Sequence, residues 1–328
     1  MTSTALTRDA AITVPLICGA MYPCSNPELV AAASEAGGIG IVQPVSLTYV
    51  HGYEYREGLR AIQQLTKRPV GFNALIEGSS RVYRARMERW LEIALEEGIR
   101  FVITSLGNPR WVADRVHAAA GKVYHDVTER RWALKARDAG VDGLIAVNRR
   151  AGGHPGPRMA EELLAETGDL GLPVVCAGGI GSPEEFATVV KLGYDGAQLG
   201  TRFIATTECT ASDAYKRAIL EAREDDIVWS ERLTGVPVAV IRTPLIDRIG
   251  LTAGWLARRL LRGRRTKHWM RAYYTLRSLK SLKSGNAAAQ DRESYWQAGK
   301  SVASIDEILP AGEVVRRFSR ALPAFSPS

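Results

Sequence analysis

Residues 173–201 read PVVCAGGIGSPEEFATVVKLGYDGAQLGT, and this stretch decides the fold class. A short apolar run at 173–178 ends in glycines, and a second short apolar run follows at 196–200. Between them, Ser182 and Pro183 supply an N-cap and a first helical residue, so residues 183–192 are expected to form a helix. The stretch therefore predicts two parallel strands joined by a helix.

The same unit recurs outward along the chain, because short β-branched runs alternate with amphipathic or Ala/Glu/Arg-rich stretches. The predicted strands are Pro15–Ala20, Ile39–Gln43, Pro69–Ala74, Arg100–Ser105, Lys122–Val127, Gly143–Asn148, Pro173–Gly178 and Gly196–Gly200. The predicted helices lie near 26–37, 55–67, 81–98, 109–120, 129–139, 157–168, 183–192 and 211–224. The strands are continuous apolar runs, which is typical of parallel strands covered on both faces.

Eight such units within about 215 residues predict an α/β protein of the TIM (β/α)8 barrel type over residues 12–224. An open Rossmann sheet is the main alternative, but no G-x-G-x-x-G follows an early strand, and GGIGIV at 37–42 has its glycines before the strand. Residues 225–328 are predicted to be a helical lid and C-terminal extension. It would contain a linker at 284–294 and a terminal helix at 306–321.

The composition excludes several classes of protein. With 46% apolar residues among 328, the chain can bury a sizeable core, so intrinsic disorder is excluded. Its four cysteines are too few for a disulfide scaffold, and reduced core thiols are expected. No apolar run reaches the ~18 residues of a membrane helix. The apolar stretch 10–25 is read as a buried first strand, not as a signal-peptide core, so a cytoplasmic protein without a membrane partner is expected.

The net charge of +8 belongs to one segment. Residues 258–283 contain ten Lys and Arg and no acid, and removing them leaves 33 basic against 35 acidic residues. Aromatic residues interleave this segment, so a nucleic-acid-binding module is one alternative function. A basic amphipathic helix of the lid explains the same residues and is preferred, so no nucleic-acid partner is expected.

In a TIM barrel the functional residues lie at the carboxyl ends of the strands. Here two of these ends are rich in glycine: Gly178 and Gly179 after the seventh strand, and Gly200 with Thr201 after the eighth. Adjacent glycines let backbone N–H groups approach a phosphate, and the loops after strands seven and eight are the usual phosphate site of such barrels. The pattern predicts a phosphorylated cofactor.

The loop after the sixth strand, VNRRAGGHPG at 147–156, carries the candidate catalytic residue His154. A histidine there can act as a base or a hydrogen-bond donor because its pKa lies near neutrality. Arg149 and Arg150 in the same loop favour an anionic substrate or are solvated. No Ser-His-Asp arrangement is readable, and the five histidines show no metal-binding spacing, so no metal is expected.

AGGHPG at 151–156, AGGIG at 177–181 and GAQLGTRF at 196–203 occur in that order, after a Met at an early strand end and an Asn at the end of the third strand. This set resembles the nitronate monooxygenase (2-nitropropane dioxygenase) family over residues 12–225 and again at YWQAGKS, 295–301. The resemblance implies a TIM barrel that binds FMN non-covalently. Its implied flavin-binding residues are Ala20, Met21, Asn73, Gly152, Gly153, Ala177, Gly178, Gly179, Gly200 and Thr201, with the phosphate on the last four. His154 would face the flavin.

The implied activity is the oxidation of alkyl nitronates with O₂ to a carbonyl compound and nitrite. The superfamily also contains flavin-type enoyl-ACP reductases and NAD(P)H:quinone reductases, so NAD(P)H-dependent reduction of a quinone or of an enoyl or CoA thioester is the alternative. Asn148 and Arg150 replace a Gly and a Glu common in the family, and Asp126 stands where a Lys often follows the strand-five His. The oligomeric state is open, a homodimer being one alternative.

Overall fold

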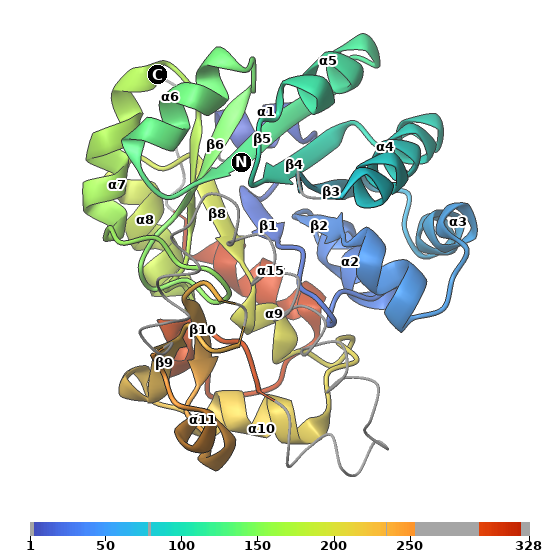
Figure 1. Ribbon diagram of the computed structural model, residues 1–328. Coiled ribbons are helices and arrows are strands. Elements are labelled where there is room, and N and C mark those ends of the chain that lie inside the picture. The colour runs from blue at the N-terminus through green and yellow to red at the C-terminus, as the bar shows by residue number, and fades with distance from the viewer. Residues whose placement is uncertain (1–2, 78–79, 234, 253–294, 323–328) are drawn as a thin grey trace.

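The computed structural model describes residues 3–77, 80–233, 235–252 and 295–322 (Figure 1). Within these residues, eight parallel strands form a closed barrel in chain order, because β8 also pairs with β1. The strands are β1 Leu16–Cys18, β2 Ile39–Val42, β3 Gly71–Leu75, β4 Phe101–Ser105, β5 Lys122–Val127, β6 Gly143–Val147, β7 Val174–Ala177 and β8 Gly196–Leu199. The predicted TIM barrel is confirmed.

Helices surround the barrel, as Figure 1 shows, and each predicted helical segment from 26 to 224 contains one. These helices are α2 Pro27–Glu35, α3 Tyr55–Leu65, α4 Arg81–Glu96, α5 Arg110–Ala118, α6 Arg130–Asp138, α7 Ala160–Thr167, α8 Pro183–Leu192 and α10 Asp213–Glu221. Shorter turns were not predicted: α1 Ala5–Asp9, α9 Thr201–Ile204, α11 Pro244–Ile249, η1 Ser46–Val50, η2 Gly168–Leu170, η3 Glu224–Asp226 and η4 Lys300–Ser304. No helix of the described ranges is long and apolar enough to cross a membrane.

The inside of the barrel is filled by alternate side chains of the strands and is closed at its amino-terminal end by α1. Leu6 of α1 packs in one cluster with inward residues such as Ile17, Phe101 and Tyr124. The Tyr124 hydroxyl donates a 2.9 Å hydrogen bond to Asp9 Oδ2 at the end of α1. Because this end is plugged, a ligand can enter the barrel only from the carboxyl ends of the strands.

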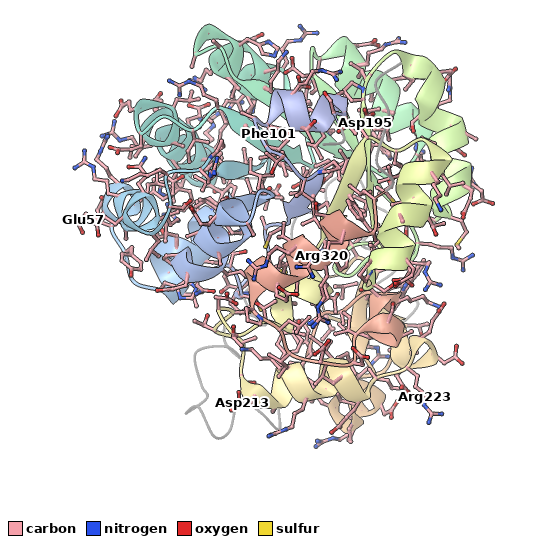
Figure 2. All side chains as sticks on the ribbon, turned by 180° about the vertical axis from the view of Figure 1, so that it is seen from behind. Glu57, Phe101, Asp195, Asp213, Arg223 and Arg320 are labelled. Atoms are coloured by element: carbon pink, nitrogen blue, oxygen red, sulfur yellow. The ribbon has the colours of Figure 1, made fainter. Side chains whose placement is uncertain are left out.

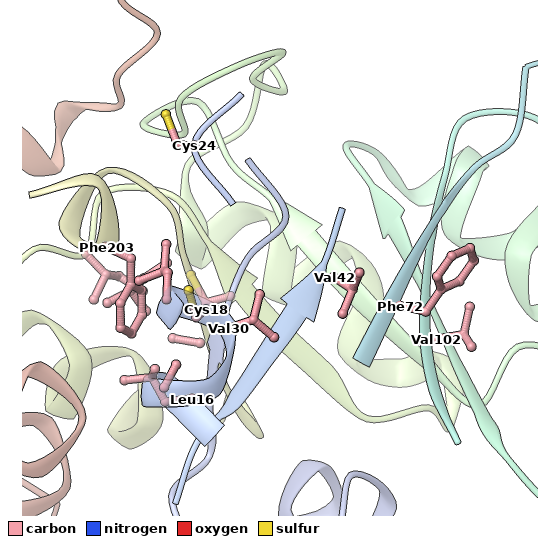
Figure 3. Close-up of a cluster of buried hydrophobic side chains, with 14 of the residues drawn as sticks. Leu16, Cys18, Cys24, Val30, Val42, Phe72, Val102 and Phe203 are labelled. Carbon is pink, nitrogen blue, oxygen red and sulfur yellow. The ribbon is translucent and has the colours of Figure 1, made fainter. Parts of the chain in front are cut away.

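A second apolar cluster fills the space between the strands and the helices. Figure 3 shows part of it, with Leu16, Val42, Phe72 and Val102 pointing outward from β1 to β4. All four cysteines are buried and none forms a disulfide. Both faces of the sheet are therefore covered, which is why these strands read as continuous apolar runs.

The chain beyond α10 differs from the predicted helical lid. β9 Ile227–Ser230 and β10 Val238–Ile241 form an antiparallel pair outside the barrel, so a helical description is wrong for this part. The two runs, IVWS and VAVI, are rich in β-branched and apolar residues, which is the local pattern of a strand. The basic segment 258–283 lies outside the described residues, and the division of the chain at 224 stays a prediction.

The terminal helix, α15 Ala311–Arg320, is confirmed and lies on the barrel wall. It packs against both α2 and α8 and lies between them (Figure 2). In the ring of helices around the barrel, this is the position expected for the helix that follows β8. Phe318 of α15 is buried, with its ring centroid 5.6 Å from that of Phe186 in α8. The last helix therefore closes the outer layer of the barrel.

Candidate active site

The carboxyl ends of the strands surround a cavity of about 1160 Å³. Its floor is made by the last inward-facing side chains of the strands from β3 to β8. They are Leu75, Ser105, Asp126, Val147, Ala177 and Gln198, and all six line the cavity. The strand register places Leu75 beside Ser105, and Ala177 beside both Val147 and Gln198. Asp126 pairs with Ile145, two residues before Val147 on β6.

All but one of the predicted site residues line this cavity. The lining residues among them are Ala20, Met21, Gly152, Gly153, His154, Ala177, Gly178, Gly179, Gly200 and Thr201. Asn73, the exception, precedes Leu75 by two residues on the same face of β3 and so lies one layer deeper in the barrel. Residues predicted from four separate stretches of sequence thus meet around one space.

Gly178 and Gly179 form a turn that only glycine fits well. Their φ angles are +113° and +77°, a region that other residues rarely adopt. A Cβ on Gly178 would lie 2.6 Å from the backbone nitrogen of Ala151. The side chain of Asn148, which is 1% exposed, holds this turn by donating a 2.9 Å hydrogen bond to the Gly178 carbonyl and accepting one of 2.8 Å from the Arg150 N–H. The loops after β6 and β7 are therefore fixed to each other.

The N-terminus of α8 has the predicted cap but is filled by its own side chain. Ser182 caps the helix, and Glu185 Oε2 accepts hydrogen bonds from the N–H groups of Gly181 and Ser182 at 2.7 and 3.1 Å. Of this loop the cavity touches Gly178, Gly179 and Ile180. An anion in the cavity would accordingly meet the glycine turn and not the end of α8.

His154 lies at the rim of the cavity in a loop that is held by the β9–β10 pair. The Gly153 carbonyl accepts a 2.7 Å hydrogen bond from the Ala239 N–H, and His154 Nδ1 is 2.9 Å from the carbonyl of Pro237. A carbonyl can only accept, so Nδ1 carries the proton in this contact. In the neutral imidazole, Nε2 then keeps a lone pair that can accept a proton.

Two floor residues have buried polar atoms without a hydrogen-bond partner among the described residues, Asp126 Oδ1 and Gln198 Oε1. Burial raises the pKa of Asp126 to about 7. The preceding His125 points to the outer face of β5, where its Nδ1 is 2.7 Å from Thr104 Oγ1 and burial lowers its pKa to about 4. Sequence reasoning missed Gln198, although the inward alternation from Gly196 would have indicated it.

The stretch 295–301, which resembles the nitronate monooxygenase family in sequence, lies outside the barrel and is hydrogen-bonded to the loops of the site. The Gly299 N–H donates a 2.9 Å hydrogen bond to Thr201 Oγ1, and the Lys300 N–H donates one of the same length to the Arg150 carbonyl. Gln297 and Ser301 also line the cavity, as does Tyr215 of α10. These three residues were not predicted.

Arg150 forms an ion pair within the protein and shares its carboxylate partner with Lys300. Its Nη1 lies 2.7 Å from Glu224 Oε1, and Lys300 Nζ lies 3.3 Å from the same oxygen. Although burial opposes it, these two cations hold the pKa of Glu224 below its usual range. Arg149 is exposed.

The cavity also extends sideways toward the start of α5 and one flank of α6. Residues of this extension include Arg110, Trp132, Lys135 and Asp138. Trp132 is 40% exposed, and Lys135 Nζ lies 4.6 Å from the centre of its ring. The extension offers an aromatic surface next to positive charge.

The family model described as nitronate monooxygenase matches residues 3–320 of this chain. A protein of Rhodococcus jostii (strain RHA1), named (3aS,4S,5R,7aS)-5-hydroxy-7a-methyl-1-oxo-octahydro-1H-indene-4-carboxyl-CoA dehydrogenase, is 27% identical over 312 residues. That match covers 95% of this chain and 85% of the relative. A probable nitronate monooxygenase of Staphylococcus saprophyticus subsp. saprophyticus is 27% identical over 289 residues, covering 75% of this chain and 81% of the relative.

Solved structures show the same architecture. FabK from Thermotoga maritima superposes with a TM-score of 0.78 at 26% identity, covering 98% of this chain and 96% of that one. Nitroalkane oxidase from Streptomyces ansochromogenes superposes with a TM-score of 0.75 at 24% identity, covering 97% of this chain and 98% of that one. The second likeness supports the fold alone.

Proposed function

This chain belongs to the nitronate monooxygenase family and is an oxidoreductase, and we propose that its cofactor is FMN, bound at the carboxyl ends of the strands. Its substrate in this proposal is a small carbon acid, with an alkyl nitronate as the first candidate. O₂ is the oxidant, and the products are a carbonyl compound and nitrite.

The cavity suits such a cofactor in two places. The turn at Gly178 and Gly179 has no side chains, so its backbone can approach a phosphate closely. Three of the six floor residues are apolar and can pack against a planar ring, and the side chains of Asp126 and Gln198 can meet its polar edge. When bound, FMN supplies the electron transfer, and the protein supplies orientation and electrostatics.

The observation that carries the proposal is the position of His154. The contact with Pro237 leaves Nε2 as the basic nitrogen of a side chain that lines the cavity. There Nε2 can take the α-proton of a neutral nitroalkane, and once protonated it can donate a hydrogen bond to the nitro oxygens of the resulting nitronate. General base catalysis of this kind contributes about 10²–10⁴-fold to rate.

The test compares His154→Ala with a remote control, His117→Gln. His117 is a surface residue paired with Asp142, so its replacement leaves the cavity intact. Both variants should be yellow and release FMN, not FAD, on heating. We expect kcat/KM with the neutral nitroalkane 1-nitropropane to fall at least ~10²-fold in His154→Ala only. Unchanged turnover in that variant would make His154 a loop residue, and a protein that takes up no FMN would refute the cofactor.

A second function is favoured by the extension toward α5 and α6 and by the relative named as a CoA dehydrogenase. In this alternative the flavin exchanges electrons between NAD(P)H and a CoA thioester, whose charged end would lie near Arg110 and Lys135. Anaerobic mixing separates the two functions. NADH or NADPH bleaches the yellow colour stoichiometrically in the second, whereas propyl nitronate does so in the first.

A further inference from the structure

Asp126 is the floor residue whose environment the proposed function leaves unexplained. It ends the inward row of β5, directly above Tyr124, and is half-buried because part of its surface faces the cavity. On β6 its register partner is Ile145, and on β4 Ser105 follows Thr104, which pairs with His125; neither Ile145 nor Ser105 carries a charge. Oδ1 is buried and has no partner among the described residues.

The charged groups nearby do not balance this carboxyl. His125 points to the outer face of β5 and stays neutral at ordinary pH. The other titratable side chains that line the cavity are those of Tyr22, Arg110, Lys135, Asp138, His154 and Tyr215. None of them contributes to the shift, since burial alone moves the pKa of Asp126 to about 7. Near neutral pH the protonated and ionised forms of the Asp126 carboxyl are therefore both populated. A charged group bound on the floor would shift the balance between them.

We propose that Asp126 takes up a proton from solvent when the flavin that rests on this floor is reduced. The inference rests on the proposed FMN site. It assigns to this chain a positioning residue for protons on the floor of the cavity.

The charge balance gives the reason. Reduction of FMN by two electrons with one proton leaves one negative charge on the ring, and a carboxylate on the floor beneath it would repel that charge. If Asp126 is ionised beforehand, it binds a second proton from water as the two electrons arrive from the reductant. Two electrons are then accompanied by two protons, one on the ring and one on Asp126 Oδ1 or Oδ2.

The sign of the pH effect follows. Well below pH 7 Asp126 is already protonated, so it neither takes up a proton nor opposes reduction. Above about pH 7 the ionised carboxyl disfavours the reduced flavin, and the extra proton must be bound. The midpoint potential of the bound flavin should therefore fall more steeply with pH above 7 than it does in a variant that cannot ionise at this position.

The experiment measures that potential from pH 5.5 to 9 by anaerobic titration with dithionite and indicator dyes. The proteins are the FMN-loaded wild type, Asp126→Asn, Asp126→Glu, and His117→Gln as a control remote from the cavity. Above pH 7 we expect the slope of wild type, Asp126→Glu and His117→Gln to report one more proton per two electrons than Asp126→Asn. The wild-type and Asp126→Asn potentials should converge toward pH 5.5.

The outcomes separate this inference from the proposed function. Parallel potentials of wild type and Asp126→Asn at all pH values overturn the role of Asp126 while the FMN site stands. If Asp126→Asn does not hold FMN, infrared difference spectra of the wild type are recorded as the flavin is reduced. The carbonyl stretch of protonated Asp126 should then appear at the pH values where the wild-type potential has its steeper slope. Absence of that band overturns the inference, whereas failure of the wild type itself to bind FMN overturns the proposed function.

Discussion

Replacing Asn148 by Ala should loosen the turn at Gly178 and weaken the binding of FMN. Besides a weak 3.6 Å hydrogen bond to Cys176 Sγ, the side chain makes two strong hydrogen bonds in a buried place, one to the Gly178 carbonyl and one from the Arg150 N–H. A net loss of about 1–1.5 kcal/mol for each bond predicts a fall of about 2–3 kcal/mol in the free energy of unfolding. If half of that energy holds the turn in its binding geometry, FMN should bind about tenfold more weakly.

Ser34→Ala is the matched control, because Ser34 is equally buried and accepts a 2.9 Å hydrogen bond from the Gly40 N–H on the far side of the barrel from the turn. Urea denaturation measures the stability of the apoproteins, and quenching of flavin fluorescence measures the Kd for FMN. Both variants should lose stability, but only Asn148→Ala should lose affinity. An unchanged Kd in Asn148→Ala would show that the glycine turn keeps its shape without the amide, and would refute the reasoning.

Two further predictions concern stability. Phe318→Ala should lower the free energy of unfolding by about 3–5 kcal/mol in urea denaturation, because it removes a buried ring of α15. The control Arg316→Ala, on the exposed side of the helix, should lower it by less than about 1 kcal/mol. Equal effects would mean that α15 is not part of the barrel wall. Hydrogen bonds from Arg60 and Arg56 lower the pKa of Glu97, so its contribution is present above the unfolded-state pKa of about 4.3 and is lost as pH falls below it. Denaturation curves of Glu97→Gln should therefore lose less stability than wild type between pH 6 and pH 3, and identical acid limbs would contradict this.

The eight strands were predictable because each is a short apolar run bounded by Gly or Pro, and both faces of a barrel sheet are covered. The runs at Ile227–Ser230 and Val238–Ile241 carry the same local signal, yet they pair with each other outside the barrel. Which strands pair is decided by contacts distant in sequence. Local patterns do not contain that information.

The site was predictable where glycine marks a strand end, as at Gly178 and Gly200, and where His154 follows two glycines. It was not predictable at Tyr215, which is an ordinary residue in sequence and reaches the cavity only because of the path of α10. Gln198, by contrast, could have been found from the strand alternation that begins at Gly196. The placement of Asn73 shows the same limit. Asn73 and Leu75 are successive inward-facing residues of β3, but only Leu75 lines the cavity.

The location of α15 sets an order for biosynthesis. β8 completes the ring of strands, but the helix that covers the gap between α2 and α8 follows only after the whole of residues 200–310. During translation the apolar flanks of α2 and α8 thus stay exposed until the last part of the chain has left the ribosome. A nascent chain at that stage exposes apolar surface that a chaperone can bind. A nonsense mutation between residues 302 and 310 would leave every described strand and cavity residue in place yet yield a protein prone to aggregation.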